Sequence, residues 1–198
     1  MATTASLPPH QITGLILAGG RATRMGGVDK GLQLFRGTPL VSHVLQRLAP
    51  QVGPLLISAN RNLGAYAALG YPVVTDEQLD LGPLGGILAG LKQCTTEYLL
   101  TAPCDCPFLP FDLGTRLGTA LIQQAADVAV ACTDRGVEPL FCLLRRSVML
   151  DLQTYLLGGG RKADGWYTHL RSVKVDYSGE TEAFANINSI DDLRRFDR

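Results

Sequence analysis

The sequence predicts an α/β protein with three layers, in which helices cover both faces of a mostly parallel sheet. Short apolar runs that suit strands alternate with segments whose apolar residues recur at helical spacing, and strand–helix–strand units form parallel sheets. Residues 12–17, ITGLIL, are apolar almost throughout, which is typical of a strand buried on both faces. With 198 residues, 46% of them hydrophobic and 18% charged, the chain can bury one core.

The first half of the chain is expected to alternate strands with helices. The first helix should follow Thr38, a suitable N-cap, with Pro39 at its first helical position. A short helix is expected over residues 62–69. A further helix opens at Pro83 and is rich in small residues, so it can pack closely on a sheet. The predicted strands are residues 12–17, 54–59, 72–75 and 97–103.

The second half continues the same pattern, with a glycine-rich loop over residues 158–165, GGGRKADG. Residues 184–188, FANIN, would place Asn186 and Asn188 on one face of a strand. Ser189 would cap a short C-terminal helix. The remaining predicted helices lie near residues 111–125 and 147–157, and the remaining strands over 127–132, 138–144 and 172–176.

Domain organisation and location follow from the absence of other signals. The sequence shows no internal repeat or linker, so residues 12–198 are expected to form one domain, preceded by a disordered tail over residues 1–11. Lys+Arg and Asp+Glu both number 18, so the net charge of zero gives no general attraction for nucleic acid or an anionic membrane. The five cysteines lie mostly in apolar segments, which favours reduced thiols and a cytoplasmic protein. No signal peptide or membrane span is expected.

A glycine loop follows the first strand directly and carries three cations. It matches neither the P-loop pattern nor G-x-G-x-x-G. Its glycines would let backbone N–H groups approach an anion, and its cations would supply charge, so we interpret it as a different phosphate cradle rather than a solvated surface turn. The residues concerned are Gly19, Gly20, Gly26 and Gly27, with Arg21, Arg24 and Lys30.

Polar residues follow several of the predicted strands, where ligands bind in open α/β sheets. Asp105 comes after an apolar strand and before Pro107, so beside a polyphosphate it would need a hard cation, or else it caps a turn. Asp76 could contact a nucleotide or also cap a turn. Cys104 and Cys106 lack a second ligand cluster, so we interpret them as packing residues. Ser58 and Asn60 also lie at a strand end, and Trp166 is either a loop anchor or a stacking surface.

Taken together, these segments resemble the molybdenum cofactor guanylyltransferases. The segment LAGGRATRMGGVDKGL is very similar to that family's signature L-A-G-G-x-x-x-R-M-G-x-D-K. The resemblance runs from about residue 12 to the C-terminus and includes ISANR, VVTDEQLDLGPLGGI, APCDCPFLP, EPLFCLL and FANINS. It implies a Rossmann-like nucleotidyltransferase fold, with a nucleotide-binding N-terminal part and an acceptor-binding C-terminal part. It also implies transfer of GMP from Mg-GTP to the phosphate of molybdopterin or molybdenum cofactor.

The resemblance assigns roles to individual residues. Asp105 would hold Mg²⁺, and Asn186 and Asn188 match a late N-x-N motif. Lys30 would bind the phosphates, with Arg24 beside it. The implied partners are GTP, molybdopterin or molybdenum cofactor, and molybdoenzyme chaperones that receive the product. The positions matching nucleotide contacts are Leu17, Ala18, Gly19, Gly20, Ser58, Asn60 and Asp76.

Two departures and several alternatives accompany this interpretation. Ser58 stands where the family often has Asn, and Cys106 where Thr is more usual. The nearest alternatives are molybdopterin cytidylyltransferases, which tend to have L-A-A-G in the first motif, and the longer sugar-1-phosphate nucleotidyltransferases. A non-catalytic nucleotide sensor is the alternative of another class, and the presence of both Lys30 and Asp105 disfavours it. The loop over 158–165, with Arg161 and Lys162, would suit the pterin and its phosphate.

Overall fold

The computed structural model describes residues 6–19, 29–78, 80–187 and 192. Within these residues a seven-stranded sheet has the order β5-β4-β1-β6-β8-β7-β9. The first four of these strands run parallel, β8 is antiparallel to both neighbours, and β7 and β9 are parallel, so the predicted mostly parallel sheet is confirmed. The strands are β1 (Ile12–Leu17), β4 (Leu55–Ser58), β5 (Val73–Val74), β6 (Tyr98–Pro103), β7 (Val128–Thr133), β8 (Gly136–Arg145) and β9 (Ser172–Asp176).

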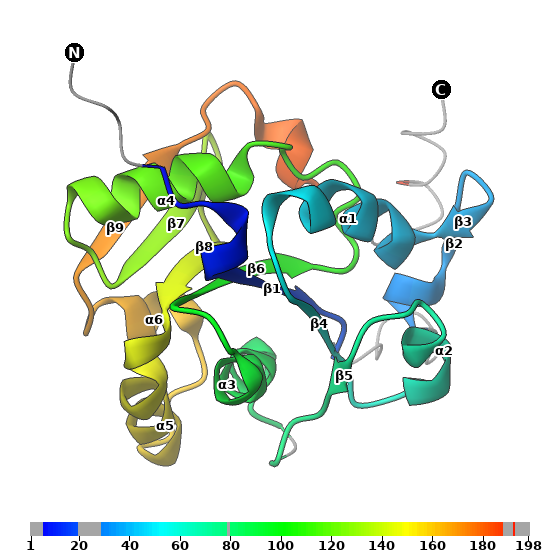
Figure 1. Cartoon of the computed structure of the whole chain (residues 1–198), viewed down its shortest axis with the longest axis horizontal. Coiled ribbons are helices and arrows are strands. Elements are labelled where there is room, and N and C mark those ends of the chain that lie inside the picture. The colour runs from blue at the N-terminus through cyan, green and yellow to red at the C-terminus, as the bar shows by residue number, and fades with distance from the viewer. Residues whose placement is uncertain (1–5, 20–28, 79, 188–191, 193–198) are drawn as a thin grey trace.

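Helices cover both faces of the sheet (Figure 1). One face carries α1 (Leu40–Leu48) and α4 (Leu113–Gln123), and the other carries α3 (Pro83–Gln93), α5 (Met149–Leu157) and α6 (Ala163–Tyr167). The short α2 (Leu63–Ala67) lies near β5 at the edge of the sheet. The smaller elements are the hairpin β2 (Leu34–Phe35) and β3 (Thr38–Pro39), and the 3-10 turns η1 (Pro9–Gln11), η2 (Lys30–Leu32), η3 (Ala49–Gln51), η4 (Arg146–Val148) and η5 (Thr181–Phe184).

Strand β1 lies between the two apolar layers. All six of its residues are buried, and its side chains alternate between the cores, with Ile16 in the α1/α4 layer and Leu15 in the α3/α5 layer. Gly90 of α3 lies so close to β1 that an added Cβ would be 2.5 Å from Leu15 Cδ2. The small residues of α3 therefore allow the close helix–sheet contact that the sequence predicts.

Three local predictions are wrong. Thr38 does not cap α1: it lies in β3 opposite Phe35, and its hydroxyl is 2.7 Å from His43 Nε2 instead of bonding a helical N–H. Residues 185–187 form no strand in the described structure, because the 3-10 turn η5 ends at Phe184 and Ile187 N donates instead to Asp105 O at 2.8 Å. The loop over 158–165 is also shorter than expected, since α6 begins within it.

The N-terminal segment and the helix lengths complete the description. Leu7, which the sequence assigns to a disordered tail, packs against the core beside Gly118, and η1 continues from it into β1. Residues 7–11 are therefore part of the folded structure rather than of a disordered tail. None of the helices in the described ranges is both long and apolar enough to pass through a membrane. The predicted C-terminal helix after Ser189 lies outside the described residues except for Asp192.

Candidate active site

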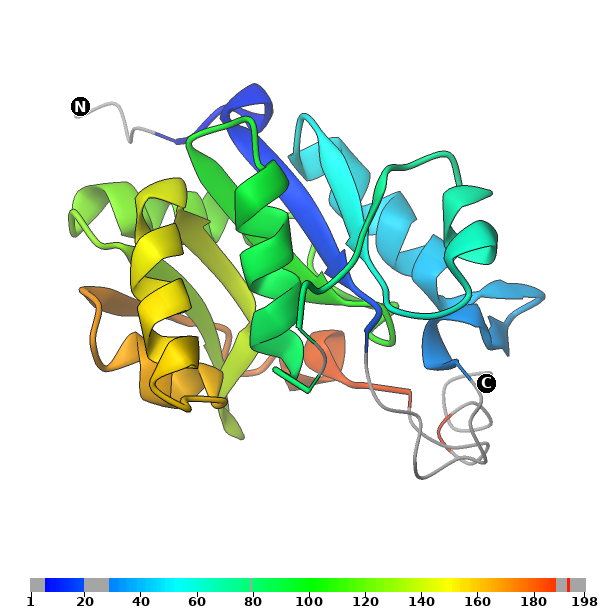
Figure 2. The same ribbon diagram turned by 90° about the horizontal axis from the view of Figure 1, so that it is seen from below.

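The polar residues singled out by the sequence gather at the carboxyl edge of the parallel strands. Leu17 is in register with Ser58 on one side and with Pro103 on the other. Backbone pairing continues past the strand ends, where Ala18 N donates to Ser58 O at 2.7 Å and Cys104 N donates to Leu17 O at 3.1 Å. Seen from below, β1, β4 and β6 end at the same side of the molecule, where α3 begins (Figure 2).

Asn60 and Asp76 form a reciprocal pair across two neighbouring strand ends. Asn60 Nδ2 donates to Asp76 Oδ2 at 3.0 Å, and Asp76 N donates to Asn60 Oδ1 at 2.9 Å. Gly19 lies against the same amide, because an added Cβ would be 3.3 Å from Asn60 Nδ2. The loop after β1 and this pair therefore border one site.

Asp76 has unused hydrogen-bonding capacity in this site. Its Oδ1 atom is buried and accepts no hydrogen bond from the described residues. Burial raises the pKa of Asp76, and the hydrogen bond from Asn60 opposes that rise. Since an unsatisfied buried acceptor is costly, Asp76 is suited to N–H donors from a ligand.

The first turn of α3 approaches the same residues because it contains glycines. A Cβ on Gly85 would be 2.7 Å from Asp76 Oδ2, and one on Gly86 would be 2.4 Å from Ser58 Oγ. Only glycine fits at these positions without displacement. Ser58 is only 1% exposed and its hydroxyl lies beneath α3, so Asn60 is the more accessible polar side chain of this segment. A nucleotide contact by Ser58 stays a prediction.

Lys30 and Asp105 face each other on the opposite side of β1. Lys30 Nζ is 3.7 Å from Asp105 Oδ2, and the Asp105 side chain is 12% exposed. Burial raises the pKa of Asp105, while the Lys30 ammonium group opposes that rise. The distance is longer than that of a charge-assisted hydrogen bond, so the ion pair leaves Asp105 incompletely compensated.

The C-terminal segment reaches the same corner. Cys106 Sγ donates to Asn186 Oδ1 at 3.4 Å and to Asp105 Oδ1 at 3.6 Å, which places Asn186 beside Asp105. Burial raises the pKa of the Cys104 and Cys106 thiols well above the ordinary value, so both stay neutral. All five cysteines are free thiols, and Cys104 and Cys106 are buried, in agreement with the interpretation of these two as packing residues.

Some predicted site residues lie outside the described part of the chain, and the sequence did not predict some residues that lie near the site. Gly20, Arg24 and Asn188 lie outside the described residues, as do Arg21, Gly26 and Gly27. The sequence interpretation did not include Asp29 or Tyr66, although Tyr66 OH donates to Asp29 Oδ1 at 2.5 Å beside Lys30. Asp29 directly precedes Lys30, the expected phosphate-binding residue, and this position is the sequence signal that could have identified it.

Two further predictions concern the C-terminal part. Trp166 is fully buried and its Nε1 donates to Asp151 Oδ1 at 2.7 Å, so it anchors α6 to α5 and offers no stacking surface. Arg161 Nη1 donates to Leu156 O at 3.0 Å and to Gly160 O at 2.7 Å, which closes the C-terminal end of α5. Arg161 and Lys162 are both exposed, but these carbonyls hold the Arg161 guanidinium, so Lys162 is the more available cation of this loop.

Sequence comparison assigns the family. The family model described as "MobA-like NTP transferase domain" matches residues 14–173. This chain belongs to the MobA-like NTP transferase family. It is therefore a nucleotidyltransferase, and the polar residues gathered at the carboxyl edge, apart from Asn186, lie within the matched range.

Curated relatives and solved structures agree with this family. The chain is 54% identical to the molybdenum cofactor guanylyltransferase of Ralstonia nicotianae, over 96% of this chain and 97% of the relative. It is 49% identical to the protein of the same name from Bordetella petrii, over 93% and 96%. The fold matches molybdopterin-guanine dinucleotide biosynthesis protein A of Archaeoglobus fulgidus with a TM-score of 0.77 at 23% identity, over 92% of this chain and 95% of that one.

MobA-like transferases typically use a divalent metal ion, and Asp105 fits one. A carboxylate is a hard oxygen donor, and this one is buried beside a strand end without full compensation by Lys30. The described residues contain no group of three or more His, Cys, Asp and Glu side chains that could hold a metal alone. A metal at Asp105 would therefore need further ligands beyond such a cluster, and substrate oxygens could supply them.

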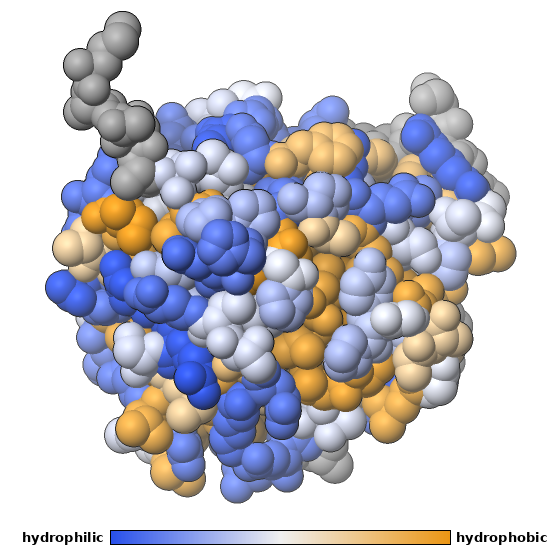
Figure 3. Space-filling model, in the orientation of Figure 1, coloured by the Kyte–Doolittle hydropathy of each residue, from blue (hydrophilic) through white to orange (hydrophobic). Residues whose placement is uncertain are grey.

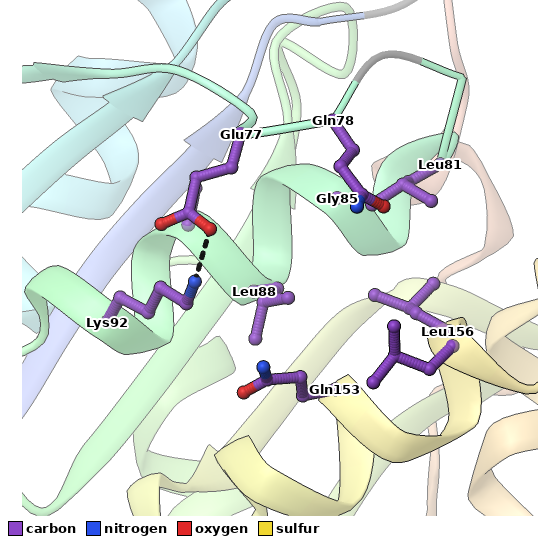
Figure 4. Close-up of a pocket in the computed structure, with 10 residues that line it drawn as sticks. Glu77, Gln78, Leu81, Gly85, Leu88, Lys92, Gln153 and Leu156 are labelled. Carbon is purple, nitrogen blue, oxygen red and sulfur yellow. Dashed lines mark hydrogen bonds and ion pairs between the residues drawn. The ribbon is translucent and has the colours of Figure 1, made fainter.

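A separate pocket of about 70 Å³ lies between α3 and α5 (Figure 4). Lys92 and Glu77 form an ion pair of 2.6 Å across one end, and leucine side chains from both helices face the opening. The pocket is lined by none of the residues that the sequence predicts to bind nucleotide or metal. The residues that the sequence predicts to bind nucleotide and metal lie instead at the strand ends.

Proposed function

We propose that this protein is a molybdenum cofactor guanylyltransferase, which transfers GMP from GTP to the terminal phosphate of molybdopterin or its molybdenum-loaded form and releases pyrophosphate. Eight relatives of 47–54% identity that carry this name support the assignment. The observation that carries it structurally is the placement of Lys30 and Asp105 on one side of β1 and of Asn60 and Asp76 on the other.

The base is proposed to bind on the Asn60–Asp76 side. Guanine presents two adjacent N–H donors on its Watson–Crick edge, which suit the buried and unsatisfied Asp76 Oδ1. Backbone groups of Leu17, Ala18 and Gly19 lie on the same side, next to Asn60. Cytosine presents a single amino donor beside two acceptors on this edge, so it could not offer the carboxylate the two adjacent N–H donors of guanine.

The triphosphate is proposed to bind on the Lys30–Asp105 side, with Arg24 and the backbone of the glycine loop. When bound at Asp105, Mg²⁺ supplies positive charge to the phosphate oxygens. Lys30 holds the phosphates and stabilises the negative charge that develops as pyrophosphate leaves. The acceptor phosphate is already an anionic nucleophile at neutral pH, so the protein needs to align it in line and needs no side-chain base.

The acceptor is proposed to bind on the C-terminal side of Asp105. Asn186 lies at this corner, and exposed Lys162 follows α5 in the C-terminal part of the chain. Residues 12–198 would then form one domain with nucleotide-binding and acceptor-binding parts. We further propose a cytoplasmic protein that passes its product to molybdoenzyme chaperones.

A nucleotide panel tests the proposed function. Pyrophosphate release is measured with purified protein, Mg²⁺ and molybdopterin, with GTP and CTP both separately and in competition. GTP should be preferred by ~30-fold or more, equivalent to about 2 kcal/mol of discrimination at the base edge. Dephosphorylated acceptor is the control, since it lacks the nucleophile and should give no release. Equal use of CTP would contradict guanylyl transfer, and GTP binding without turnover would favour a nucleotide sensor.

A further inference from the structure

Asp29 lies directly before Lys30, and its carboxylate is held by two side chains from a later part of the chain. Tyr66 OH donates to Asp29 Oδ1 at 2.5 Å. Asn62 Nδ2 donates to Asp29 Oδ2 at 3.0 Å. Tyr66 lies in α2 and Asn62 directly precedes it. Because these two residues bond both carboxylate oxygens, the position and the orientation of Asp29 are fixed.

These contacts replace the local hydrogen bonds that such residues usually make. Asp29 is the residue before η2, yet its side chain does not cap that turn. Asn62 precedes α2 in a left-handed conformation, with φ of 51°, and its side chain does not cap α2 either. Polar residues at helix starts commonly bond to their own helix. Asp29 and Asn62 instead bond to each other, which points to a role for this long-range contact.

The residue after Lys30 is held by the same tyrosine. A Cβ on Gly31 would be 2.6 Å from Tyr66 Oη and 3.0 Å from Cys104 Sγ. Tyr66 is fully buried, so its ring cannot move aside easily. Burial, Cys104 and the bond to Asp29 raise the pKa of Tyr66, so its hydroxyl remains a donor at any ordinary pH. Tyr66 therefore contacts both neighbours of Lys30, the carboxylate of Asp29 and the backbone of Gly31.

We propose that Asp29, Tyr66 and Asn62 are positioning residues that hold Lys30 where its ammonium group meets the phosphates of the nucleotide. The inference rests on the proposed function, because it takes a nucleoside triphosphate as the partner of Lys30. None of the three need touch the substrate, since each acts through the backbone of Lys30. Asn62 and Tyr66 follow β4 closely, so the same contacts join the base-binding strand end to the phosphate-binding lysine.

Tyr66→Phe is the first test, because it removes one hydroxyl and keeps the buried ring. We expect kcat to fall by ~10-fold, since a displaced cation loses alignment with the reacting phosphates. GTP binding, measured by calorimetry, should weaken by a similar factor while guanosine binding is unchanged, because guanosine has no phosphates. Tyr98→Phe is the matched control: Tyr98 is also buried, its hydroxyl accepts from Arg145 Nη1 at 3.2 Å, and it begins β6, at the opposite end of that strand from Asp105.

Combination with Lys30→Ala separates positioning from a general structural role. If Tyr66 acts through Lys30, adding Tyr66→Phe to Lys30→Ala should cause no further loss of GTP affinity or rate. The inference would be refuted if Tyr66→Phe caused equal losses of rate or GTP affinity in the wild-type and Lys30→Ala proteins. It would also be refuted if Tyr66→Phe weakened guanosine binding and GTP binding equally. Asn62→Ala changes an exposed residue and should lower kcat and GTP affinity, as Tyr66→Phe does. It replaces Tyr66→Phe as the test if the Tyr66→Phe protein does not fold. Wild-type protein that releases no pyrophosphate would contradict the proposed function, but the comparison of GTP with guanosine would still decide the role of Tyr66.

Discussion

Asp105→Asn should abolish most activity without weakening the fold. The substitution keeps the size of the side chain and removes the charge that would hold the metal. We expect kcat to fall by ~1,000-fold, equivalent to about 4 kcal/mol of transition-state stabilisation. In the pyrophosphate assay, raised Mg²⁺ should recover part of the loss if metal affinity is what failed. Near-normal turnover of folded Asp105→Asn protein at ordinary Mg²⁺ would remove Asp105 from the mechanism.

The effect of Asp105→Asn on stability follows from the burial of the carboxylate. Burial raises the pKa of Asp105 in the folded protein, so the folded state retains a proton to higher pH than the unfolded chain. The free energy of unfolding therefore falls as pH rises from the unfolded pKa through the folded pKa, and the ionised carboxylate weakens the fold above that window. Asparagine carries no such charge. The variant should melt at the same temperature as wild type or up to ~3 °C higher at neutral pH, a gain of about 1 kcal/mol.

Asp127→Asn is the matched control for this experiment. Asp127 directly precedes β7, at the ends of the strands opposite the candidate site, and accepts from Arg171 Nε at 2.9 Å and Nη2 at 2.6 Å. These hydrogen bonds lower its pKa, so its contribution is present above the unfolded pKa and is lost as pH falls through the folded pKa. Asp127→Asn should therefore lower the melting temperature slightly at neutral pH and leave turnover unchanged. A drop in melting temperature for Asp105→Asn comparable with that for Asp127→Asn would show that Asp105 is a structural carboxylate.

Three other substitutions test the site. Lys30→Ala should lower kcat/KM for GTP by at least ~100-fold and leave the melting temperature nearly unchanged; retained activity with a large melting shift would make Lys30 structural. Gly86→Ala should lower the free energy of unfolding by ~1–3 kcal/mol in denaturant titrations, because its methyl group would lie 2.4 Å from Ser58 Oγ, and adding Ser58→Ala should restore part of it. Lys162→Ala should raise the KM for molybdopterin and spare GTP affinity; weaker GTP binding instead would place this loop on the nucleotide side.

Much of the fold could be predicted because its signals are local. The apolar run of β1 and the glycine-rich α3 report their burial directly in the sequence, and both lie where predicted. The antiparallel pairing of β8 with β6 was not predicted, because pairing depends on partners far along the chain. Thr38 was misassigned since a Thr-Pro pair suits a helix start as well as the strand end it forms here.

Part of the candidate site could also be predicted from the sequence, and part could not. Asp76 and Asp105 could be found from their positions after apolar strands, because carboxyl ends of parallel strands gather ligand-binding residues. The hydrogen bonds of Asp29 could not, since its partners lie 33 and 37 residues later and nothing in the spacing pairs them. Nor could the burial of Ser58 beneath α3 be anticipated, because it depends on the close approach of Gly86.

The two carboxylates of the site share a physical condition that links stability to function. Burial raises the pKa of both Asp76 and Asp105, and neither is fully compensated by the described residues: Asp76 Oδ1 accepts no hydrogen bond from them, and Lys30 stays 3.7 Å from Asp105. Figure 3 shows hydrophilic and hydrophobic residues side by side on one face of the molecule, and polar groups exposed on such a surface are hydrated. A chain selected only for stability would remove these buried charges. Asp76 and Asp105 lie on opposite sides of β1, where Asp76 is suited to N–H donors and Asp105 to a cation. A nucleotide bound with its metal ion would compensate both charges.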